Sequence, residues 1–522
     1  MKKFSIAIFI AAFLAVSSPV FAQDHFDLRN YAKDGKTAKN YVTGVRNQRN
    51  FGICWSYASY AAMESNILMK GLSNGKMHNF SEWHMGNYGT KRTTASYHKN
   101  NVGNWGANWA HAVDYVANGH GIHHETSAPL PTKVGKNNSY LEYKPALHMK
   151  NKANYFIRSV VSIDKYNYAN KESEYISKVK NMIKTHGAVY TYYRTASTGD
   201  DSSKYYRNVS RVDGKSAVIK KIHCYQESDK TKVKPANHAV AIVGWAKNVT
   251  FTGFDGKQRT RDCWIIKNSW GNNHTTTNGY HYIAMDATSA VGEAVAYNME
   301  RGNKYKNVVT NGIPTQLKHV VWHDGVIEPE RYYKESWATA KMKSNGQYIE
   351  SVGLWANVTG KNVKVSIFAS LDDMKQNKAA YSETFTSSSQ EGFKVFDLKK
   401  KIKLNGEYYI AYRITEKDGR NILNEFKIKL YDDQINGKGL AKGSNLIVYR
   451  NADGTIAATE DLKDYKLNSG RKDSDGNIIW NKYDAAVGVV AYTTETPEPA
   501  TMLILFGGAS GILMRRKRKK VA

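Results

Sequence analysis

The chain has 522 residues, 41% of them hydrophobic, and a formal net charge of +29. This length allows two or three domains, and the composition is that of a globular protein rather than a disordered one. A chain this basic can adhere to anionic polysaccharide, lipopolysaccharide or nucleic acid. Because no nucleic-acid motif is present, we interpret the charge as dispersed over the surface and expect no nucleic-acid partner.

Residues 1–22 have the layout of a secretory signal peptide. Two lysines at positions 2 and 3 precede an apolar run over 4–16, and Val20 and Ala22 supply the small residues of a cleavage site before Gln23. The alternative, a first transmembrane helix, fits less well because the apolar run is short. We therefore predict that the rest of the chain is exported.

Cys54 stands at the start of a predicted helix. Residues 55–70 are rich in apolar and small residues, and Gly71 follows as a helix terminator. A thiol on the first turn of a helix lies near the positive end of the dipole, which favours the reactive thiolate. An isolated cysteine in an apolar helix is more often a packing residue, so the interpretation of Cys54 depends on partners elsewhere.

Two later segments supply such partners. His238 opens the apolar segment 238–245, which predicts a strand, and Asn268 follows a predicted strand at 263–267. A neighbouring imidazole converts a thiol into a nucleophile, and an asparagine can accept a hydrogen bond from the ring without adding a charge. His238 alone could be a core histidine and residues 268–271 alone a turn, but the three together, in this order, indicate a thiol peptidase.

These segments resemble the papain family of cysteine peptidases. The resemblance implies that Cys54 is the nucleophile, that His238 is its base and proton shuttle, and that Asn268 orients the imidazole. It also implies that Gln48 offers its side-chain amide to the oxyanion. Trp270 resembles the indole that shields the bond between histidine and asparagine in this family.

The sequence also departs from the family pattern. Phe51 and Ile53 stand where the family usually has a second cysteine and a small residue, and the histidine and asparagine lie farther downstream than is usual. Long surface insertions explain that spacing, because loop length costs little free energy. Residues 24–48 already resemble the start of the mature domain, so an inhibitory propeptide has no room before them. Any latency is then expected from a loop, the second domain or the export route.

The resemblance implies an α+β catalytic domain over residues 23–302, with a helical lobe facing a β-barrel lobe across a groove. In the helical lobe, 80–85 resembles the family's second helix region and 110–117 the helix after the substrate cleft. The substrate-binding candidates are Gly103, Trp105, Gly106 and Trp270, although a structural turn explains the glycines nearly as well. The barrel lobe is expected to contain a helix at 176–184, strands at 238–245, 263–267 and 280–284, and a polar insertion at 195–235 lying over the barrel face.

The remaining cysteines, Cys224 and Cys263, can form a disulfide if their segments are neighbours. Spacing alone does not give the distance between their Cα atoms, so bonded and unbonded forms stay open. The histidine-rich segment 120–124 is interpreted as a loop. We expect no metal site and no cofactor.

Residues 303–494 predict an all-β sandwich, because stretches with a period of two recur between turns of Gly, Asn, Asp and Lys. The predicted strands are 348–355, 363–369, 393–398, 408–414 and 487–492. The layout resembles the lectin-like domain that follows some bacterial papain-like peptidases. Carbohydrate or surface binding and a purely structural role both remain open, and Trp355 can be a core residue or a binding platform.

Residues 495–522 contain Pro-Glu-Pro, an apolar run at 502–514 and a basic block at 515–520. This arrangement resembles the PEP-CTERM sorting signal of Gram-negative bacteria, which an exosortase processes. It implies a transient tether to the inner membrane, followed by the cell surface or the extracellular matrix. An ordinary tail anchor is the alternative.

Three functions are consistent with these features. The preferred one is an exported thiol-dependent peptidase, an endopeptidase acting on proteins or peptides. The second is a catalytically silent adhesin that binds exopolysaccharide through the sandwich. The third is an acyl-transfer or cross-linking enzyme that uses the same cysteine and histidine.

Overall fold

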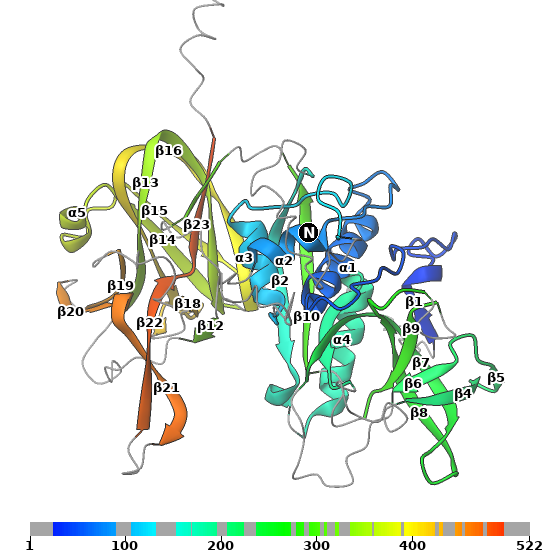
Figure 1. The fold of residues 1–522 in the computed structure, drawn as a ribbon. Coiled ribbons are helices and arrows are strands. Elements are labelled where there is room, and N and C mark those ends of the chain that lie inside the picture. The colour runs from blue at the N-terminus through cyan, green and yellow to red at the C-terminus, as the bar shows by residue number, and fades with distance from the viewer. Residues whose placement is uncertain are drawn as a thin grey trace, which may run out of the picture.

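The computed structural model describes residues 25–89, 106–131, 153–168, 170–195, 206–223, 236–272, 278–286, 292–302, 307–310, 319–322, 335–357, 360–387, 391–422, 427–431, 444–451, 455–472 and 478–494. They form an α+β part up to residue 302 and an all-β part from residue 307, which lie side by side (Figure 1). The predicted signal segment, the C-terminal segment, Gly103, Trp105 and Cys224 lie outside the described residues.

Three helices pack together in the α+β part: α1 (Cys54–Met69), α2 (Glu82–Tyr88) and α3 (Trp109–Ala117). Helix α1 is buried along nearly its whole length, polar residues included, so it is a central element and not a surface helix. It ends before Gly71, whose φ of 67° is the left-handed conformation common after a helix. Its bounds differ by one residue at each end from the predicted 55–70.

The barrel strands of the α+β part close a ring. Strand β7 (His238–Thr252) pairs with β8 (Gln258–Lys267), β8 with β9 (Tyr280–Ala284), β9 with β6 (Lys221–His223), β6 with β4 (Tyr206–Val212), and β4 with the far end of β7. The short β5 (Lys215–Ser216) pairs with the end of β4. The sequence predicts that segment 195–235 lies over the barrel face. Its described strands instead complete the barrel, because their backbone groups find partners on β7 and β9.

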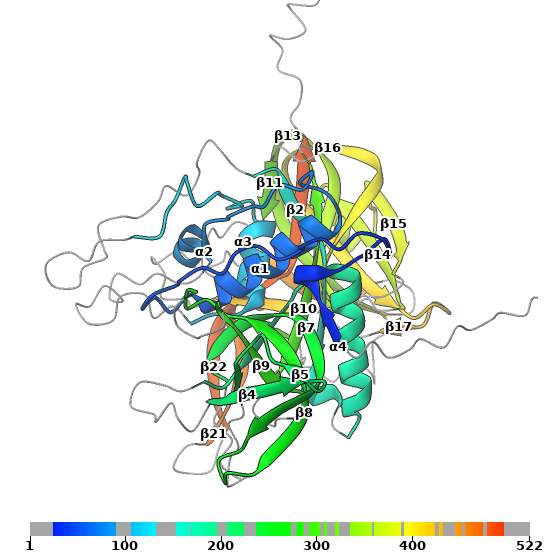
Figure 2. The ribbon, with the colours of Figure 1, turned by 90° about the vertical axis from the view of Figure 1, so that its right-hand side faces the viewer.

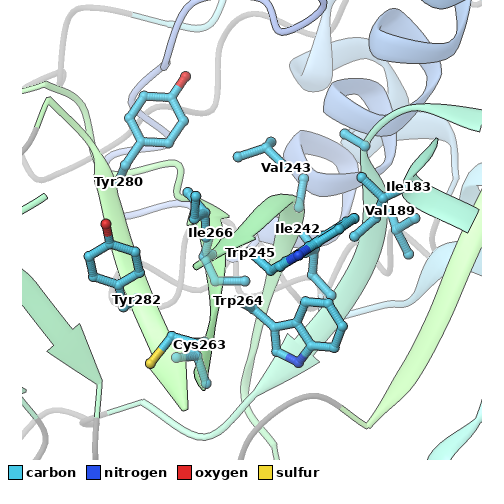
Figure 3. Packing of buried hydrophobic residues seen from close by; sticks show 14 of the residues in the cluster. Ile183, Val189, Ile242, Val243, Trp245, Cys263, Trp264, Ile266, Tyr280 and Tyr282 are labelled. Carbon is cyan, nitrogen blue, oxygen red and sulfur yellow. The ribbon is translucent and has the colours of Figure 1, made fainter. Parts of the chain in front are cut away.

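In Figure 2 the other labelled elements of the α+β part lie above this ring and to its right. Strand β1 (His25–Asp27) and strand β3 (Val189–Tyr193) both pair with β7, and β2 (Tyr155–Asp164) pairs with β10 (Glu293–Arg301). Two short 3-10 helices lie at Leu28–Asn30 and Lys165–Tyr168. Helix α4 (Glu172–His186), longer than the predicted 176–184, packs Ile183 into the barrel core beside Trp245 and Trp264 (Figure 3).

Two long strands organise the all-β part. Strands β13 (Glu335–Asn357) and β16 (Glu391–Thr415) pair along their length, with register shifts between Asn345 and Tyr348 and between Ile349 and Ser351. The first half of β13 also pairs with β19 (Asn445–Arg450), and its second half pairs with β23 (Val489–Thr494), so one strand contributes to two regions of sheet. Such irregularities bend a strand and increase its twist. The predicted strands 348–355, 393–398 and 408–414 are therefore sections of these two longer strands.

The other elements of the all-β part are short: β11 (Asn307–Thr310), β12 (His319–Trp322), β14 (Asn362–Phe368), α5 (Leu371–Lys375), β15 (Tyr381–Thr386), β17 (Asn421–Ile422), β18 (Lys427–Tyr431), β19 (Asn445–Arg450), β20 (Ile456–Asp461), a 3-10 helix at Leu462–Asp464, β21 (Tyr465–Lys472), β22 (Ile478–Val487) and β23 (Val489–Thr494). Strands β12, β18, β22 and β21 form a separate four-stranded sheet.

One apolar cluster joins the two parts. It combines residues of α1, α3, β2 and β10 with Trp355, Phe393 and neighbours from the all-β part. The rings of Trp109 and Trp355 lie 5.8 Å apart, and Trp355 is fully buried. At the edge of this contact Arg158 forms an ion pair with Asp397 at 2.9 Å. Trp355 is thus a core residue and not an exposed binding platform.

Candidate active site

Cys54 is the first residue of α1, and it is partly exposed. Its sulfur accepts a hydrogen bond from the backbone N–H of Ala239 at 3.5 Å. Because Ala239 directly follows His238, this contact brings the start of α1 against the start of β7. The two segments that carry the predicted cysteine and histidine therefore meet.

The protonation of Cys54 is governed mainly by burial. Burial raises the pKa of the thiol, while hydrogen bonds from the backbone N–H groups of Ala239, Trp55 and Cys54 itself act in the opposite direction. The sequence predicted that the helix N-terminus favours the thiolate. In this structure the loss of hydration acts against that effect and raises the pKa of the Cys54 thiol.

The His238 ring is held by Asn268. The distance from His238 Nε2 to Asn268 Oδ1 is 2.8 Å, and the same oxygen accepts a hydrogen bond from the Ser269 backbone N–H at 2.8 Å. The amide oxygen is therefore the atom that faces the ring, and Nε2 must carry the proton. In the neutral imidazole this leaves Nδ1 as the basic nitrogen. Burial lowers the pKa of His238 to about 4, against the raising effect of the bond to Asn268.

Two aromatic rings pack against His238. The indole of Trp270 is stacked on it at 4.6 Å, with an angle of 26° between the planes. Tyr193, the cross-strand neighbour of His238 on β3, lies at 5.8 Å in a T-shaped arrangement. The histidine, the asparagine and the indole that were predicted to act together are therefore in contact.

Gln48 is tied to the segment that follows Asn268. Its backbone N–H donates to the Ser269 carbonyl at 2.8 Å, and its Oε1 accepts a short hydrogen bond from the Ser269 hydroxyl. Its Nε2 donates to the Phe51 carbonyl at 2.8 Å. An amide nitrogen has two hydrogens, so this bond leaves the second for another acceptor.

A network of buried charges lies behind these residues. Arg46 binds both carboxylate oxygens of Glu64, at 2.6 and 2.7 Å, and also contacts Glu82. Lys267 Nζ donates to Thr43 Oγ1 at 3.0 Å, and Thr43 in turn donates to Glu64. Sequence patterns did not indicate this network, because its members are scattered along the chain and each alone resembles a surface residue.

Other candidates are placed only in part. Gly106 lies in open surroundings, since a Cβ built on it would meet no described atom within 4 Å, so close packing does not require a glycine there. Cys263 is buried on β8, with its sulfur 3.5 Å from the Arg261 carbonyl. The proposed bond to Cys224 stays a prediction. Among the described residues no group of His, Cys, Asp and Glu side chains is arranged to hold a metal ion.

Three buried imidazoles make the fold sensitive to acid. Burial lowers the pKa of His238 to about 4 and that of His223 to about 3, and burial with the charges of His223 and His238 lowers that of His281. In the unfolded chain each imidazole binds a proton near pH 6.5. The unfolded state thus holds more protons, and stability falls as the pH drops from about 6.5 to about 4.

Glu82 acts in the opposite direction. Burial raises its pKa to about 7 against the attraction of Arg46, so its proton stabilises the fold between about pH 7 and about 4.5. Burial also raises the pKa of Glu125, but it lowers those of His78, His124 and His186 as well, so the imidazoles still outnumber the carboxyl groups. We expect the midpoint temperature of unfolding to be roughly 5–10 °C lower at pH 4.5 than at pH 7, measured by circular dichroism. The substitution His281→Leu should flatten this dependence, and a midpoint that does not change with pH would contradict the argument.

Comparisons with known proteins agree with this geometry. A partly exposed cysteine at the start of a helix, beside a strand that begins with a histidine bound to an asparagine, defines the class of papain-like folds. Residues 23–299, more than half of the chain, match the family described as "Papain family cysteine protease". The chain belongs to the papain family of cysteine proteases. Residues 495–519 match the "PEP-CTERM protein-sorting motif", which indicates export and surface sorting in Gram-negative bacteria.

Curated relatives match about half of the chain. The chain is 26% identical to "Cathepsin L2" of Homo sapiens over 259 residues, which cover 49% of this chain and 62% of that protein. It is 28% identical to "Pro-cathepsin H" of Mus musculus over 250 residues, which cover 48% of this chain and 59% of that protein. The chain therefore spans less than two thirds of the length of either relative.

A solved structure matches both parts. It is "The crystal structure of the cysteine protease and lectin-like domains of Cwp84, a surface layer associated protein of Clostridium difficile", with a TM-score of 0.59 and 18% identity over 87% of each chain. A second structure, of a variant of the clostridial cysteine protease Cwp84 after propeptide cleavage, has the same TM-score of 0.59, with 17% identity over 87% of this chain and 97% of that one. This likeness confirms the papain-like fold.

Among the described residues no helix combines the length and apolar character needed to cross a membrane.

Proposed function

We propose that this protein is an exported cysteine peptidase that hydrolyses peptide bonds through Cys54, His238 and Asn268. The observation that carries the proposal is the orientation of the imidazole. Because Asn268 Oδ1 accepts from both Ser269 N–H and His238 Nε2, the ring keeps Nδ1 as its base. The residue after that histidine contacts the cysteine sulfur.

In the proposed reaction, His238 Nδ1 takes the proton of the Cys54 thiol as the sulfur attacks the substrate carbonyl carbon. The negative charge then moves to the carbonyl oxygen, where the Cys54 backbone N–H and the second hydrogen of Gln48 Nε2 would stabilise it. His238 returns the proton to the leaving amine, the C–N bond breaks, and an acyl-enzyme remains. A water molecule gives a proton to His238 and attacks the acyl carbon. The C–S bond breaks, the thiol forms again and the acid leaves.

Burial acts on both partners in this reaction. Burial raises the pKa of the thiol and lowers that of the imidazole, so both effects disfavour charge separation before substrate binds. Proton transfer is then coupled to substrate binding, because the developing charges acquire partners only in the complex. We propose an extended polypeptide as the substrate, bound through its backbone as is usual in open grooves.

The proposed setting is the cell surface, after processing of the C-terminal motif by an exosortase. For the all-β part we propose a supporting role in preference to sugar binding. Its most prominent tryptophan, Trp355, packs on Trp109 of the α+β part and is fully buried. Binding of exopolysaccharide by another face remains the second proposal for this part.

The test is covalent labelling of the full-length protein with a thiol-directed epoxide, followed by mass spectrometry and an assay with an unfolded protein substrate. We expect one label on Cys54, loss of cleavage in proportion to labelling, and neither label nor cleavage in Cys54→Ala. An unlabelled wild-type protein without peptidase activity would refute the proposal. Transamidation products in excess of hydrolysis products would assign the same pair to acyl transfer.

A further inference from the structure

Segment 206–223 brings a polar group behind the His238 ring. The hydroxyl of Tyr206 on β4 lies 3.0 Å from the hydroxyl of Tyr193 and 3.1 Å from Thr195 Oγ1. Tyr193 is fully buried, and on its other side it makes the T-shaped contact with His238. A chain of contacts therefore runs from the barrel strand β4 through Tyr193 to the imidazole.

The backbone of Tyr193 is held in register with His238 by a separate clamp. The side chain of Asn237 accepts a hydrogen bond from Thr195 N–H at 2.8 Å and donates to the Thr195 carbonyl at 3.0 Å. The Asn237 N–H donates to the Tyr193 carbonyl at 3.1 Å. The ring of Tyr193 is thus fixed at its backbone end by Asn237 and at its hydroxyl end by Tyr206.

The remaining space around Tyr193 is filled by two imidazoles. His223 on β6 lies 4.8 Å from the Tyr193 ring, and His281 on β9 lies 5.7 Å from it. Both also contact the Tyr206 ring, at 5.3 and 5.8 Å. All four side chains come from the barrel lobe, and Tyr206 and His223 come from the strands that complete the ring.

We propose that Tyr193, anchored by the hydroxyl of Tyr206, is a positioning residue that keeps the His238 ring aligned for proton exchange with Cys54. The inference rests on the proposed function of Cys54 and His238. The bond to Asn268 fixes one atom of the imidazole but leaves the ring able to tilt about it. Trp270 restricts one face of the ring, and Tyr193, the cross-strand neighbour, supplies the second restriction.

The effect of a less firmly held Tyr193 ring depends on the groups that face His238. They are Asn268 after β8, Tyr193 on β3 and His281 on β9, and Cys54 on α1 lies against the backbone N–H of the next residue, Ala239. If Tyr193 loses its anchor, the imidazole is less often in position to take the proton of the Cys54 thiol. The acidic limb of Cys54 alkylation should then move to higher pH, because a thiol without an aligned base gives up its proton less readily.

The test substitutes Tyr206→Phe in the full-length protein, which removes one hydroxyl and keeps the ring. Alkylation of Cys54 by iodoacetamide is followed against pH by mass spectrometry of the Cys54 peptide, and kcat and KM are measured for a peptide substrate. We expect kcat to fall about tenfold with KM changed less than about twofold, and the acidic limb of alkylation to rise by about 0.5 pH unit or more. Tyr193→Phe should move both readouts in the same direction, and the double variant should be no worse than Tyr206→Phe, because each variant removes the bond between the two hydroxyls and Tyr206→Phe also removes the contact with Thr195.

The matched control is Tyr175→Phe. Tyr175 is buried in the same lobe and donates its hydroxyl to the Gly292 carbonyl at 2.7 Å. This variant loses a comparable hydrogen bond and should keep the wild-type profile even if its unfolding temperature falls. If Tyr206→Phe changes only that temperature, as the control does, Tyr193 is merely structural and the inference is wrong. Alkylation needs no peptide, so a protein that cleaves nothing but shows the shifted limb would refute the proposed function alone.

Discussion

The variant Arg46→Leu is expected to lose about 3–5 kcal/mol of unfolding free energy, because it leaves buried carboxylates without their cation. The side chain of Glu64 is fully buried and that of Glu82 is 2% exposed. Glu64 also accepts hydrogen bonds from the Phe80 N–H and from Thr43. These neutral donors cannot replace a positive charge, and Lys267, whose pKa burial lowers to about 8, is joined to Glu64 through the Thr43 hydroxyl. Denaturation by urea at pH 7.5 measures the loss.

The effect on the site should accompany the loss of stability. Glu64 lies on α1, which begins with Cys54, and Lys267 directly precedes Asn268. Arg46, Glu82 and Lys267 line the same small cavity as Asn268. We therefore expect faster exchange of backbone amides around residue 268, together with a lower rate of peptide cleavage. The charge network then connects α1, which begins with Cys54, to the end of β8, which Asn268 follows.

Two further variants distinguish the loss of the buried ion pairs from a general loss of packing. Arg259→Leu removes an exposed pair with Asp255 at 3.0 Å and should cost less than about 1 kcal/mol. The triple variant Arg46→Leu, Glu64→Leu, Glu82→Leu should recover part of the stability lost by Arg46→Leu, because no buried carboxylate is left without a cation and Lys267, whose pKa burial lowers to about 8, can release its proton. An Arg46→Leu protein as stable as Arg259→Leu would show that the buried carboxylates do not need the guanidinium.

The sequence could indicate the candidate site because each of its members sits in a short local motif. Cys54 precedes a helix with a glycine terminator, and His238 and Asn268 flank strands with continuous apolar runs. Local signals of this kind can be recognised in the sequence, because the residues of the motif also determine the backbone conformation that places the side chain. The papain-like fold could therefore be predicted from three blocks that make up a small share of the chain.

The parts that were missed depend on contacts between distant segments. Strands β4 and β6 have no strong alternation, and their place in the barrel is set by the open edges of β7 and β9. Strands β13 and β16 were predicted as shorter strands because turn-forming residues interrupt their pattern. In the structure the two strands pair along their whole length, and this pairing keeps the interrupted sections extended. The charges of Arg46 and Glu64 were missed for the same reason, since only the fold reveals that each is the partner of the other.

The variant Trp355→Ala should destabilise the α+β part as well as β13, the strand on which Trp355 lies. Trp355 is fully buried between Trp109 of α3 and Phe393 of β16, with ring distances of 5.8 and 5.6 Å. Its removal opens a cavity at the junction of the two parts, and tryptophan-to-alanine changes in cores cost about 3–5 kcal/mol. Because α3 then loses packing on one side, its amide hydrogens should exchange faster in the native state.

A second tryptophan of the all-β part provides the control. Trp337 is 4% exposed and packs with Phe368 and Met374 in a separate cluster. We expect Trp337→Ala to lower the free energy of unfolding by a similar amount. At the same temperature below the unfolding transition, the α3 amide hydrogens should exchange more slowly in Trp337→Ala than in Trp355→Ala. Equal exchange in the two variants would mean that α3 reports only global unfolding. The stated difference would establish that the all-β part stabilises the lobe from which Cys54 extends, so that the second domain belongs to the catalytic unit and is more than an appended binding module.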